Sequence, residues 1–163
     1  YQIIETENEL YLIMEHANAG ELFEYIVRND RVDDVNAARF FDHILEGVHH
    51  LHLHGVCHRD LKPENLLLEN PHSNIKIIDF GFSTCIPNDK KVKIFCGTPS
   101  YMAPEIVNKT EYCGPPADVW ALGVLLFTML CGCFPYRGAT DAELYGKISN
   151  AEYKIPSDIT LSA

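Results

Sequence analysis

The sequence predicts a mainly α fold of the α+β class, in which long helical segments outnumber a few short strands. Its 163 residues are enough for one domain with a substantial core. Apolar residues make up 47% of the chain and charged residues 22%, as in ordinary globular proteins. There are no internal repeats and no low-complexity tracts, so the whole chain is available for folded structure.

The predicted strands form two pairs, each around a polar turn. Residues 1–5 and 10–14 flank a turn of Thr, Glu and Asn residues. Residues 66–68 and 75–78 flank a second polar turn at residues 69–74.

The predicted helices lie at residues 21–27, 35–54, 118–131 and 140–149. The third is apolar on nearly every side, so we expect it to be central and covered on most sides. Its strongly apolar run, residues 119–133, is shorter than the roughly 20 residues that a membrane-spanning helix needs, which favours a core helix. The segment 79–116 contains several Gly and Pro residues, and we expect a long functional loop there.

Charge and cysteine usage restrict the class of protein. The 23 acidic and 13 basic residues give a formal net charge of −10, which disfavours nucleic acid as a partner because phosphates require basic surface. The six cysteines form no CxxC pair and no regular framework. Scattered thiols without a signal peptide are typical of reduced, intracellular proteins, so we expect a cytoplasmic location and no membrane partner.

Five of the eight histidines lie at residues 49–58, which raises the question of a metal site. On the wheel of the second helix, His43, His50 and His54 fall on the polar face, and His52 falls in the apolar arc. That arc comprises Phe40, Phe41, Ile44, Leu45, Val48 and Leu51. Two histidines four residues apart bind a metal only weakly, and no carboxylate or thiol is placed to complete the shell. A solvated histidine face with one core histidine is the preferred interpretation.

The residues that follow these histidines suit phosphoryl transfer from a nucleotide. In HRDLKPEN, Asp60 precedes Lys62 and Asn65, and Asp79 ends the apolar run of IIDFG. An Asp and an Asn that converge with a second Asp can hold Mg²⁺ through oxygen ligands. A lysine two residues after an aspartate can neutralise phosphate while the aspartate accepts a proton. HRD, DFG and APE together, at this spacing, are highly specific.

On these motifs the chain resembles a eukaryotic protein kinase. The motifs are HRD at 58–60, KPEN at 62–65, DFG at 79–81, CGTPSYMAPE at 96–105 and DVWALGVLLF at 118–127. KPEN and GTP resemble the serine/threonine branch. The stretches ETENELYLIMEHANAGELFEYI, NIKIIDFGFS and ELYGKISNAEYKIP are most similar to the calcium/calmodulin-dependent kinase group, and within it to the SNF1/AMP-activated and microtubule-affinity-regulating kinases. The resemblance covers essentially the whole chain.

The resemblance implies transfer of the γ-phosphate of Mg-ATP to Ser or Thr hydroxyls of protein substrates. It makes Asp60 the catalytic base, with Lys62 steadying the transferring phosphate and Thr98 hydrogen-bonding near both. It assigns the Mg²⁺ ligands to Asn65 and Asp79. The expected cofactors are therefore ATP and Mg²⁺.

The resemblance also assigns residues around the nucleotide. Met14 holds the gatekeeper position, and Glu15 and Ala17 belong to the hinge, whose backbone N–H and C=O groups read adenine. Leu67 is the floor of the adenine site, and Glu21 contacts ribose or a basic residue of the substrate.

The remaining assignments concern contacts with the protein substrate and residues with structural roles. Glu64 is expected to contact a basic residue of the protein substrate, before the Ser or Thr. For Glu21 and Glu64 a solvated surface role is the alternative. His58, Phe80 and Asp118 match the stacked spine and its anchor on the central helix, which are structural roles.

The resemblance is incomplete at both ends. The first lysine is Lys62 and no G-x-G occurs, so the phosphate-binding lysine and glycine-rich loop of the small lobe are absent. Residues 1–17 correspond to a small-lobe remnant of two strands with the hinge, and residues 18–163 to an incomplete large lobe. Its last helices are missing, with the arginine that normally pairs with Glu105.

Two functions follow from this pattern. The first is a serine/threonine protein kinase seen here as a partial catalytic domain, which is expected to be inactive alone. The alternative is a truncated, non-catalytic kinase-like protein that binds partners or competes for substrate. The intact chemical residues, and a chain that begins inside a strand pair without an initiator Met, favour the first.

A second departure concerns regulation. In the two named kinase types a phosphorylated threonine lies two residues before the cysteine of CG[ST]P, and Arg59 receives its phosphate. Here that position is Ile94. Ser83, Thr84 and Thr98 do not match it. Activation is then constitutive, or another contact orders the loop, or the segment is never ordered.

Overall fold

The computed structural model describes residues 1–69, 74–86, 90–157 and 159. The α-helices of this part are α1 (Leu22–Asn29), α2 (Asp34–Leu53), α3 (Pro104–Val107), α4 (Gly114–Cys131) and α5 (Asp141–Ser149). The strands are β1 (Gln2–Glu5), β2 (Leu10–Ile13), β3 (Val56–Cys57), β4 (Leu66–Leu68), β5 (Ile75–Ile77) and β6 (Thr84–Cys85). Short 3₁₀ turns occupy Pro63–Asn65 and Pro99–Tyr101.

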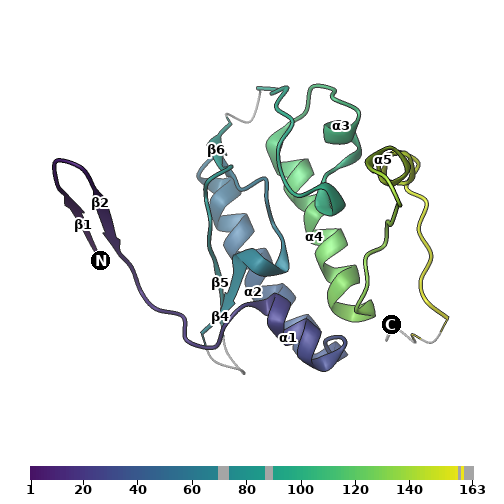
Figure 1. Cartoon of the computed structure of the whole chain (residues 1–163), viewed down its shortest axis with the longest axis horizontal. Helices are drawn as coiled ribbons and strands as arrows, with labels where there is room; N and C mark the ends of the chain where they lie inside the picture. The colour runs from purple at the N-terminus through teal and green to yellow at the C-terminus, as the bar shows by residue number, and fades with distance from the viewer. Residues whose placement is uncertain (70–73, 87–89, 158, 160–163) are drawn as a thin grey trace.

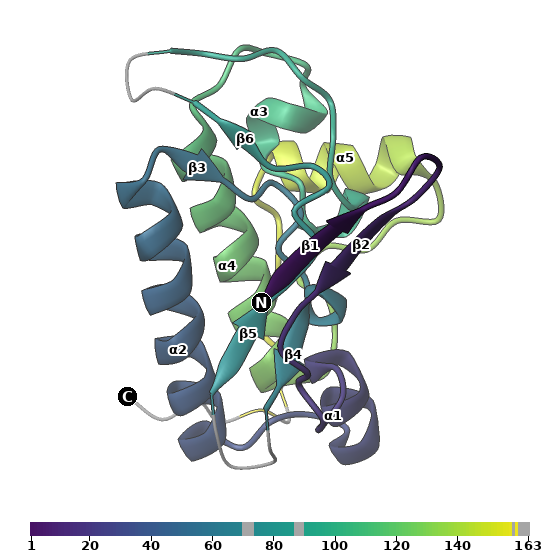
Figure 2. The ribbon, with the colours of Figure 1, turned by 90° about the vertical axis from the view of Figure 1, so that its left-hand side faces the viewer.

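The body of the molecule is built around α4. Figure 1 shows α4 in the middle, with α2 and the β4–β5 pair on one side and α5 on the other. The view from the side shows β4 and β5 next to each other, with α2 alongside them (Figure 2). The β1–β2 pair stands away from this body and is joined to it by an extended stretch of chain (Figure 1).

Helix α2 begins one residue before its predicted start and ends one residue early. Asp33 caps it by accepting a hydrogen bond from the backbone N–H of Asn36 at 3.1 Å. Phe40, Ile44 and Val48, spaced four residues apart, form one buried stripe that faces the core. The amphipathic pattern therefore predicted this helix and its buried face correctly.

Two side chains at the margins of α2 differ from the prediction. Leu45 and His43 lie about 100° to either side of Ile44 on the helix. Leu45, predicted to be apolar core, is 41% exposed, because the buried stripe is narrower than the apolar arc. His43, predicted to be solvated, is half-buried, because β5 packs against that side of the helix where Ile77 meets Gly47.

Helix α4 starts four residues earlier than predicted. Its first turn contains Pro115 and Pro116, which are tolerated there because the first N–H groups of a helix have no partner within it. It ends at Gly132, which has a φ of 65° and donates its N–H to the Thr128 carbonyl. By length and composition α4 is the one helix among the described residues that could cross a membrane, but half of its residues are buried in this fold and the core cluster is built on it. The prediction of a core helix is confirmed.

The β4–β5 pair has the predicted strand positions. Leu66 lies opposite Ile77 and Leu68 opposite Ile75 in an antiparallel register. The bend of the predicted turn, at residues 70–73, lies outside the described residues. One further backbone bond, from the N–H of Ile78 to the carbonyl of Asn65 at 2.9 Å, extends the pairing to the residue before β4. The residues that enter β4 and leave β5 are therefore held next to each other.

The predicted loop at residues 79–116 has more regular structure than its Gly and Pro content indicated. It contains β6, which pairs with β3, the 3₁₀ turn at Pro99–Tyr101, helix α3 and the start of α4. Prolines in first-turn positions begin the 3₁₀ turn, α3 and α4, so these prolines start helices rather than interrupt them. Residues 87–89 of this segment lie outside the described residues.

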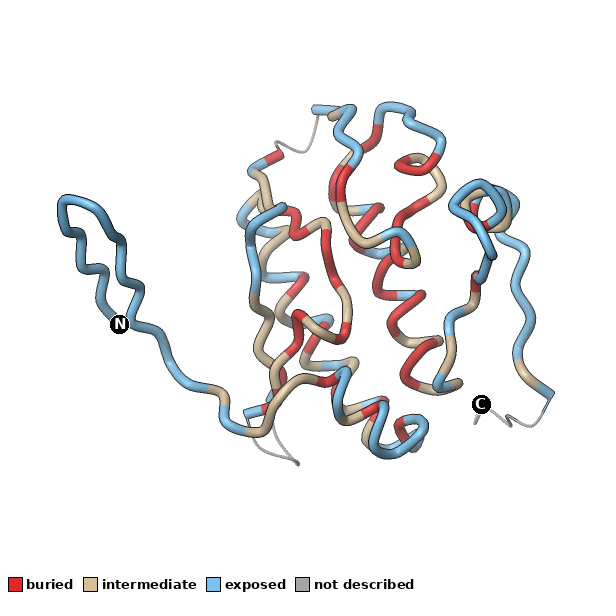
Figure 3. Tube along the Cα trace, viewed as in Figure 1, coloured by how far each residue is buried: buried red, intermediate tan, exposed pale blue. Residues whose placement is uncertain are grey.

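The β1–β2 pair has no buried residue. Figure 3 shows it exposed along its whole length, and Ile3, Leu12 and Met14 are 71%, 54% and 71% exposed. The two strands pair only with each other, with Gln2 opposite Ile13 and Glu5 opposite Leu10. This pair is therefore stabilised by its own ladder and not by packing on the body.

An apolar groove of about 450 Å³ runs along one side of α4. Val119, Trp120 and Phe127 line it from α4, and Tyr136 and Tyr153 line it from the chain after α4. Val119 is 59% exposed, although α4 was expected to be covered on most sides. Contiguous exposed apolar surface of this kind promotes association.

We expect the isolated 163-residue chain to self-associate through this groove. Sedimentation velocity should show oligomers, and Val119→Lys should shift the chain towards monomer because a charge in the groove opposes apolar contact. Val27→Lys is the matched control, because Val27 is 61% exposed on α1 and does not line the groove. A stable monomer with a cooperative thermal transition contradicts this expectation.

Candidate active site

Three predicted catalytic residues form a closed triangle of polar contacts. Lys62 Nζ lies 2.9 Å from Asp60 Oδ2 and 3.0 Å from Thr98 Oγ1. The Thr98 hydroxyl donates to Asp60 Oδ1 at 2.7 Å. Asp60 and Lys62 come from the stretch after β3, whereas Thr98 lies 38 positions after Asp60 and caps the 3₁₀ turn at Pro99–Tyr101. Both oxygens of the Asp60 carboxylate are therefore fixed in direction.

The triangle also sets the charge of Asp60. Burial of its carboxyl acts to raise the pKa, but hydrogen bonds from Lys62 and Thr98, and the charge of Lys62, together lower the pKa below its ordinary value. Asp60 is therefore a carboxylate at neutral pH, 4% exposed and directed by two donors. Such a group can accept a hydrogen bond from an incoming hydroxyl.

The two predicted metal ligands are brought together by the β4–β5 pair. Asn65 immediately precedes β4 and Asp79 follows Ile78, whose N–H is bonded to the Asn65 carbonyl. The Asn65 side-chain amide donates to the Asp60 carbonyl at 2.8 Å and to Asp60 Oδ2 at 3.2 Å. Its amide oxygen is then the atom left for a cation. The exposed Asp79 follows Ile78, so its backbone lies close to that of Asn65, and an amide oxygen with a carboxylate suits Mg²⁺, which prefers oxygen ligands.

Asp79 has a left-handed backbone conformation. Its φ is 61°, in the left-handed region that few residues other than Gly and Asn or Asp adopt. One of its carboxylate oxygens accepts a hydrogen bond from the Gly81 N–H at 3.1 Å, which stabilises this turn. The DFG turn is therefore held locally by Asp79 itself.

The backbone that carries Asp60 is held by a buried carboxylate on α4. Asp118 accepts hydrogen bonds from the N–H groups of His58 and Arg59, at 3.0 and 2.8 Å, and is 1% exposed. Arg59 has a φ of 69°, so the chain turns sharply just before Asp60. The His58 ring bonds the Ile78 carbonyl at 3.0 Å and packs edge-on against Phe80 at 5.2 Å. These contacts agree with the structural roles predicted for His58, Phe80 and Asp118.

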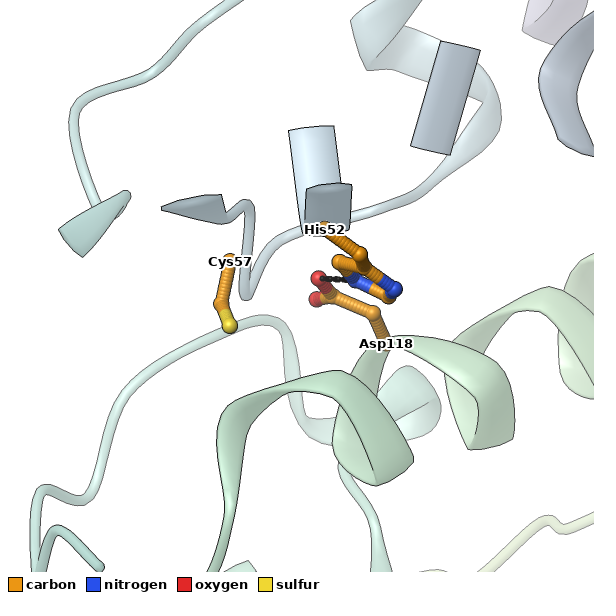
Figure 4. Close-up of side chains that lie close together, drawn as sticks. All are labelled: His52, Cys57 and Asp118. Atoms are coloured by element: carbon orange, nitrogen blue, oxygen red, sulfur yellow. Dashed lines mark hydrogen bonds and ion pairs between the residues drawn. The ribbon is translucent and has the colours of Figure 1, made fainter. Parts of the chain in front are cut away.

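His52, Cys57 and Asp118 converge within 4.8 Å, a grouping that the sequence analysis did not find (Figure 4). His52 Nε2 bonds Asp118 Oδ2 at 2.8 Å, although the two residues are 66 positions apart. Burial, followed by the charge of Asp118, raises the pKa of the Cys57 thiol to about 11. The backbone of Gly114 packs directly on the Cys57 sulfur. A metal here would need Cys57 as a thiolate, and it would compete with the backbone N–H groups that donate to Asp118. We therefore assign these three residues a structural role in the site.

The predicted nucleotide residues lie in two places. Glu21 forms a β-bridge with Leu67, so these two are neighbours at the edge of β4. Met14 lies after β2 and is exposed. Glu15 forms an exposed ion pair of 3.2 Å with Lys76 on β5, and Ala17 is half-buried in the stretch that joins the strand pair to the body. The structure thus brings Glu21 and Leu67 together, and it leaves the Met14 side chain exposed.

Glu64 has a buried oxygen without a hydrogen-bond partner among the described residues. It lies in the 3₁₀ turn between Lys62 and Asn65. It is close enough to Tyr101 that, after burial, its charge helps to raise the Tyr101 pKa. Glu64 is half-buried, and its negative charge can attract a cationic side chain to this part of the surface.

Sequence reasoning missed Lys76 and Tyr112, in addition to the pairing of His52 with Asp118. Tyr112 is 4% exposed and bridges to the chain before Thr98. Lys76 lies inside the predicted strand 75–78 and Tyr112 inside the predicted loop 79–116, and the sequence carried no signal for these contacts. Partners that lie 20 to 66 positions apart have no local spacing rule.

Comparisons with known proteins agree with this geometry. A family profile described as protein kinase domain matches residues 1–162. The chain is 41% identical over 163 residues to serine/threonine protein kinase OSK3 of Oryza sativa subsp. indica, and 41% identical over 163 residues to serine/threonine protein kinase OSK4 of Oryza sativa subsp. japonica. Each match covers 100% of this chain and 32% of the rice protein. The chain thus spans about a third of the length of the curated relatives it matches.

We expect no tight Zn²⁺ site in the histidine-rich region. His50 and His54 are exposed, with ring centroids 4.3 Å apart, and two imidazoles make an incomplete shell. Calorimetric titration with Zn²⁺ should show no site tighter than about micromolar. A stoichiometric tight site that is lost in His50→Ala or in Cys57→Ser contradicts this and identifies which group binds.

Proposed function

Since the chain belongs to the protein kinase family, we propose that it is part of the catalytic domain of an ATP-dependent serine/threonine kinase. The reaction is transfer of the γ-phosphate of Mg-ATP to Ser or Thr hydroxyls of protein substrates. The observation that carries the proposal is the Asp60–Lys62–Thr98 triangle, with Asn65 bonded to it and Asp79 alongside.

In this proposal Asp60 orients the substrate hydroxyl and takes its proton. Its lowered pKa makes it a weak base, which suits a loose phosphoryl-transfer transition state in which positioning matters more than base strength. Lys62 neutralises charge on the transferring group, and Thr98 keeps Asp60 and Lys62 in register. Mg²⁺ supplies charge neutralisation and orientation of the phosphates when it is bound to Asn65 and Asp79.

The nucleotide assignments are part of the same proposal. Met14, Glu15 and Ala17 serve as gatekeeper and hinge, with Leu67 under the adenine and Glu21 near the ribose. In this proposal residues 1–17 are the end of the small lobe with the hinge, and residues 18–163 are most of the large lobe. The separation of β1–β2 from the body in Figure 1 supports this division.

Substrates with basic residues before the Ser or Thr are favoured by charge. The unsatisfied Glu64 oxygen lies two residues from Lys62. The net charge of −10 also favours a basic peptide as the partner.

We also propose a kinase group and a cellular location for this protein. The stretches quoted above support the calcium/calmodulin-dependent kinase group. The scattered cysteines, which form no CxxC pair and no regular framework, support a reducing, cytoplasmic compartment.

A chimera tests the proposed reaction. Residues 1–163 of this chain replace the matched stretch of rice kinase OSK3, which supplies the remainder of a kinase. We expect the chimera to phosphorylate a basic serine peptide, and Asp60→Asn to lower kcat by at least about 10². Asp42→Asn is the matched control, because Asp42 is exposed on α2.

Two results contradict the proposal. A loss of less than twofold in Asp60→Asn removes Asp60 from the role of base. A chimera that folds, binds substrate peptide and transfers no phosphate supports the alternative, a non-catalytic kinase-like module. The 163-residue chain alone is expected to transfer negligible phosphate, because positioning of the nucleotide requires a covering lobe.

Glu64 provides a separate test of substrate choice. In the chimera, Glu64→Gln should raise KM for a peptide with arginine before the serine by about tenfold, because a charge-assisted bond is lost. KM for a matched peptide with norleucine in that position should not change. Equal effects on both peptides would show that Glu64 acts on the fold rather than on the basic residue.

A further inference from the structure

The position of Thr98 depends on the segment that precedes it, residues 92–98, which we term the anchored segment. Thr98 donates to Asp60 and accepts from Lys62, so displacement of this segment removes one side of the triangle. Ile94 and Phe95 within it are 45% and 48% exposed, so the segment is not held by burial of those side chains. Cys96 in the same segment is 9% exposed, and the exposed part of the segment is held by directional contacts.

Those contacts converge on Tyr112. Val92 and Tyr112 exchange two backbone hydrogen bonds of 2.9 Å in an antiparallel bridge. The Tyr112 hydroxyl donates to the Ile94 carbonyl at 3.0 Å. Tyr112 itself is 4% exposed and lies two residues before α4. The anchored segment is thereby tied to the start of the core helix.

The Tyr112 hydroxyl is suited to this role at neutral pH. Burial raises its pKa, and the nearby Arg59 guanidinium opposes that rise without reversing it. The hydroxyl is therefore protonated and available as a donor. The acceptor is the main-chain carbonyl of Ile94, so the bond does not depend on which side chain occupies position 94.

Arg59 has one of its guanidinium nitrogens bonded to a main-chain oxygen, and its Nη1 is buried with no hydrogen-bond partner among the described residues. Its Nε donates to the Phe82 carbonyl at 2.7 Å. Within the described part of the chain no carboxylate forms an ion pair with it. Arg59 thus links the chain before Asp60 to the segment after DFG, and its guanidinium lies close enough to Tyr112 to act on the Tyr112 pKa.

We propose that Tyr112 is a positioning residue that holds the anchored segment in place without phosphorylation, and so keeps Thr98 against Asp60. The inference rests on the proposed kinase function for its effect on turnover, but the anchoring itself does not. The alternatives for a chain with Ile94 at this position were constitutive activation, a loop ordered by another contact, and a segment that is never ordered. This proposal favours the second, with Tyr112 as the contact.

The first test uses turnover in the rice chimera. Tyr112→Phe keeps the ring and the backbone bridge and removes only the hydroxyl. We expect kcat to fall by at most about fivefold, because one hydrogen bond is lost, with KM for ATP unchanged. Tyr145→Phe is the matched control, because Tyr145 packs on Phe95 through its ring and that contact is retained. Phosphatase treatment of the unsubstituted chimera should leave its activity intact.

The second test does not need activity. Lys93 lies between the bridged Val92 and the bonded Ile94, so tryptic cleavage after Lys93 reports release of the anchored segment. Mass spectrometry of limited digests should show cleavage about fivefold faster in Tyr112→Phe than in the unsubstituted chimera or in Tyr145→Phe.

The outcomes separate the two proposals. Equal cleavage rates in Tyr112→Phe and the unsubstituted chimera overturn the anchoring, whatever the activity. A chimera without activity, but with faster cleavage in Tyr112→Phe, overturns the kinase proposal and keeps the anchor. Loss of activity on phosphatase treatment, traced to Ser83, Thr84 or Thr98, overturns independence from phosphorylation.

Discussion

The Asp118 carboxylate is the contact on which the site depends. A buried carboxylate is costly unless it is fully hydrogen-bonded, and Asp118 meets this condition with two backbone amides and the His52 ring. These donors come from the end of α2 and from the chain just before Asp60. The central helix, the long helix beside it and the catalytic loop therefore meet at one side chain. A left-handed residue such as Arg59 persists only where its surroundings enforce it, and Asp118 provides that enforcement.

A second constraint comes from the antiparallel β4–β5 pair. Because the strands run in opposite directions, the residue before one strand lies beside the residues after the other. This places Asn65 and Asp79 together although 14 positions separate them, and the bond from Ile78 to Asn65 fixes the alignment. Asn65 also donates a hydrogen bond to Asp60. Asn65 therefore connects the proposed metal ligands with the proposed catalytic base.

Much of the fold could be predicted from local patterns. The stripe of Phe40, Ile44 and Val48 specified α2, and the short apolar runs specified β4 and β5 nearly to the residue. The start of α4 could not be predicted, because Gly114 with two following prolines has the composition of a turn. That stretch is helical because a helix accepts proline in its first turn.

The candidate site was predicted less directly. The convergence of Asp60, Lys62 and Thr98 followed from resemblance, since no spacing rule connects positions 60 and 98. His52 was correctly expected to face the apolar side of its helix, but its bond to Asp118 could not be foreseen. The contacts of Tyr112 could not be predicted for the same reason, since its partners are backbone atoms 18 and 20 positions earlier.

The contact between Gly114 and Cys57 restricts how this protein can vary. A Cβ atom on Gly114 would lie 2.8 Å from both Cys57 Cβ and Ile86 Cδ1, closer than such atoms approach. The first turn of α4 and the strand that leads into the catalytic loop therefore touch with no room for a side chain. An alanine at position 114 becomes tolerable only if the backbone that carries Cys57 moves away and the Ile86 side chain gives way, and a larger residue at 57 excludes it. Substitutions at positions 57, 86 and 114 are thus coupled, because each changes the space that the other two occupy.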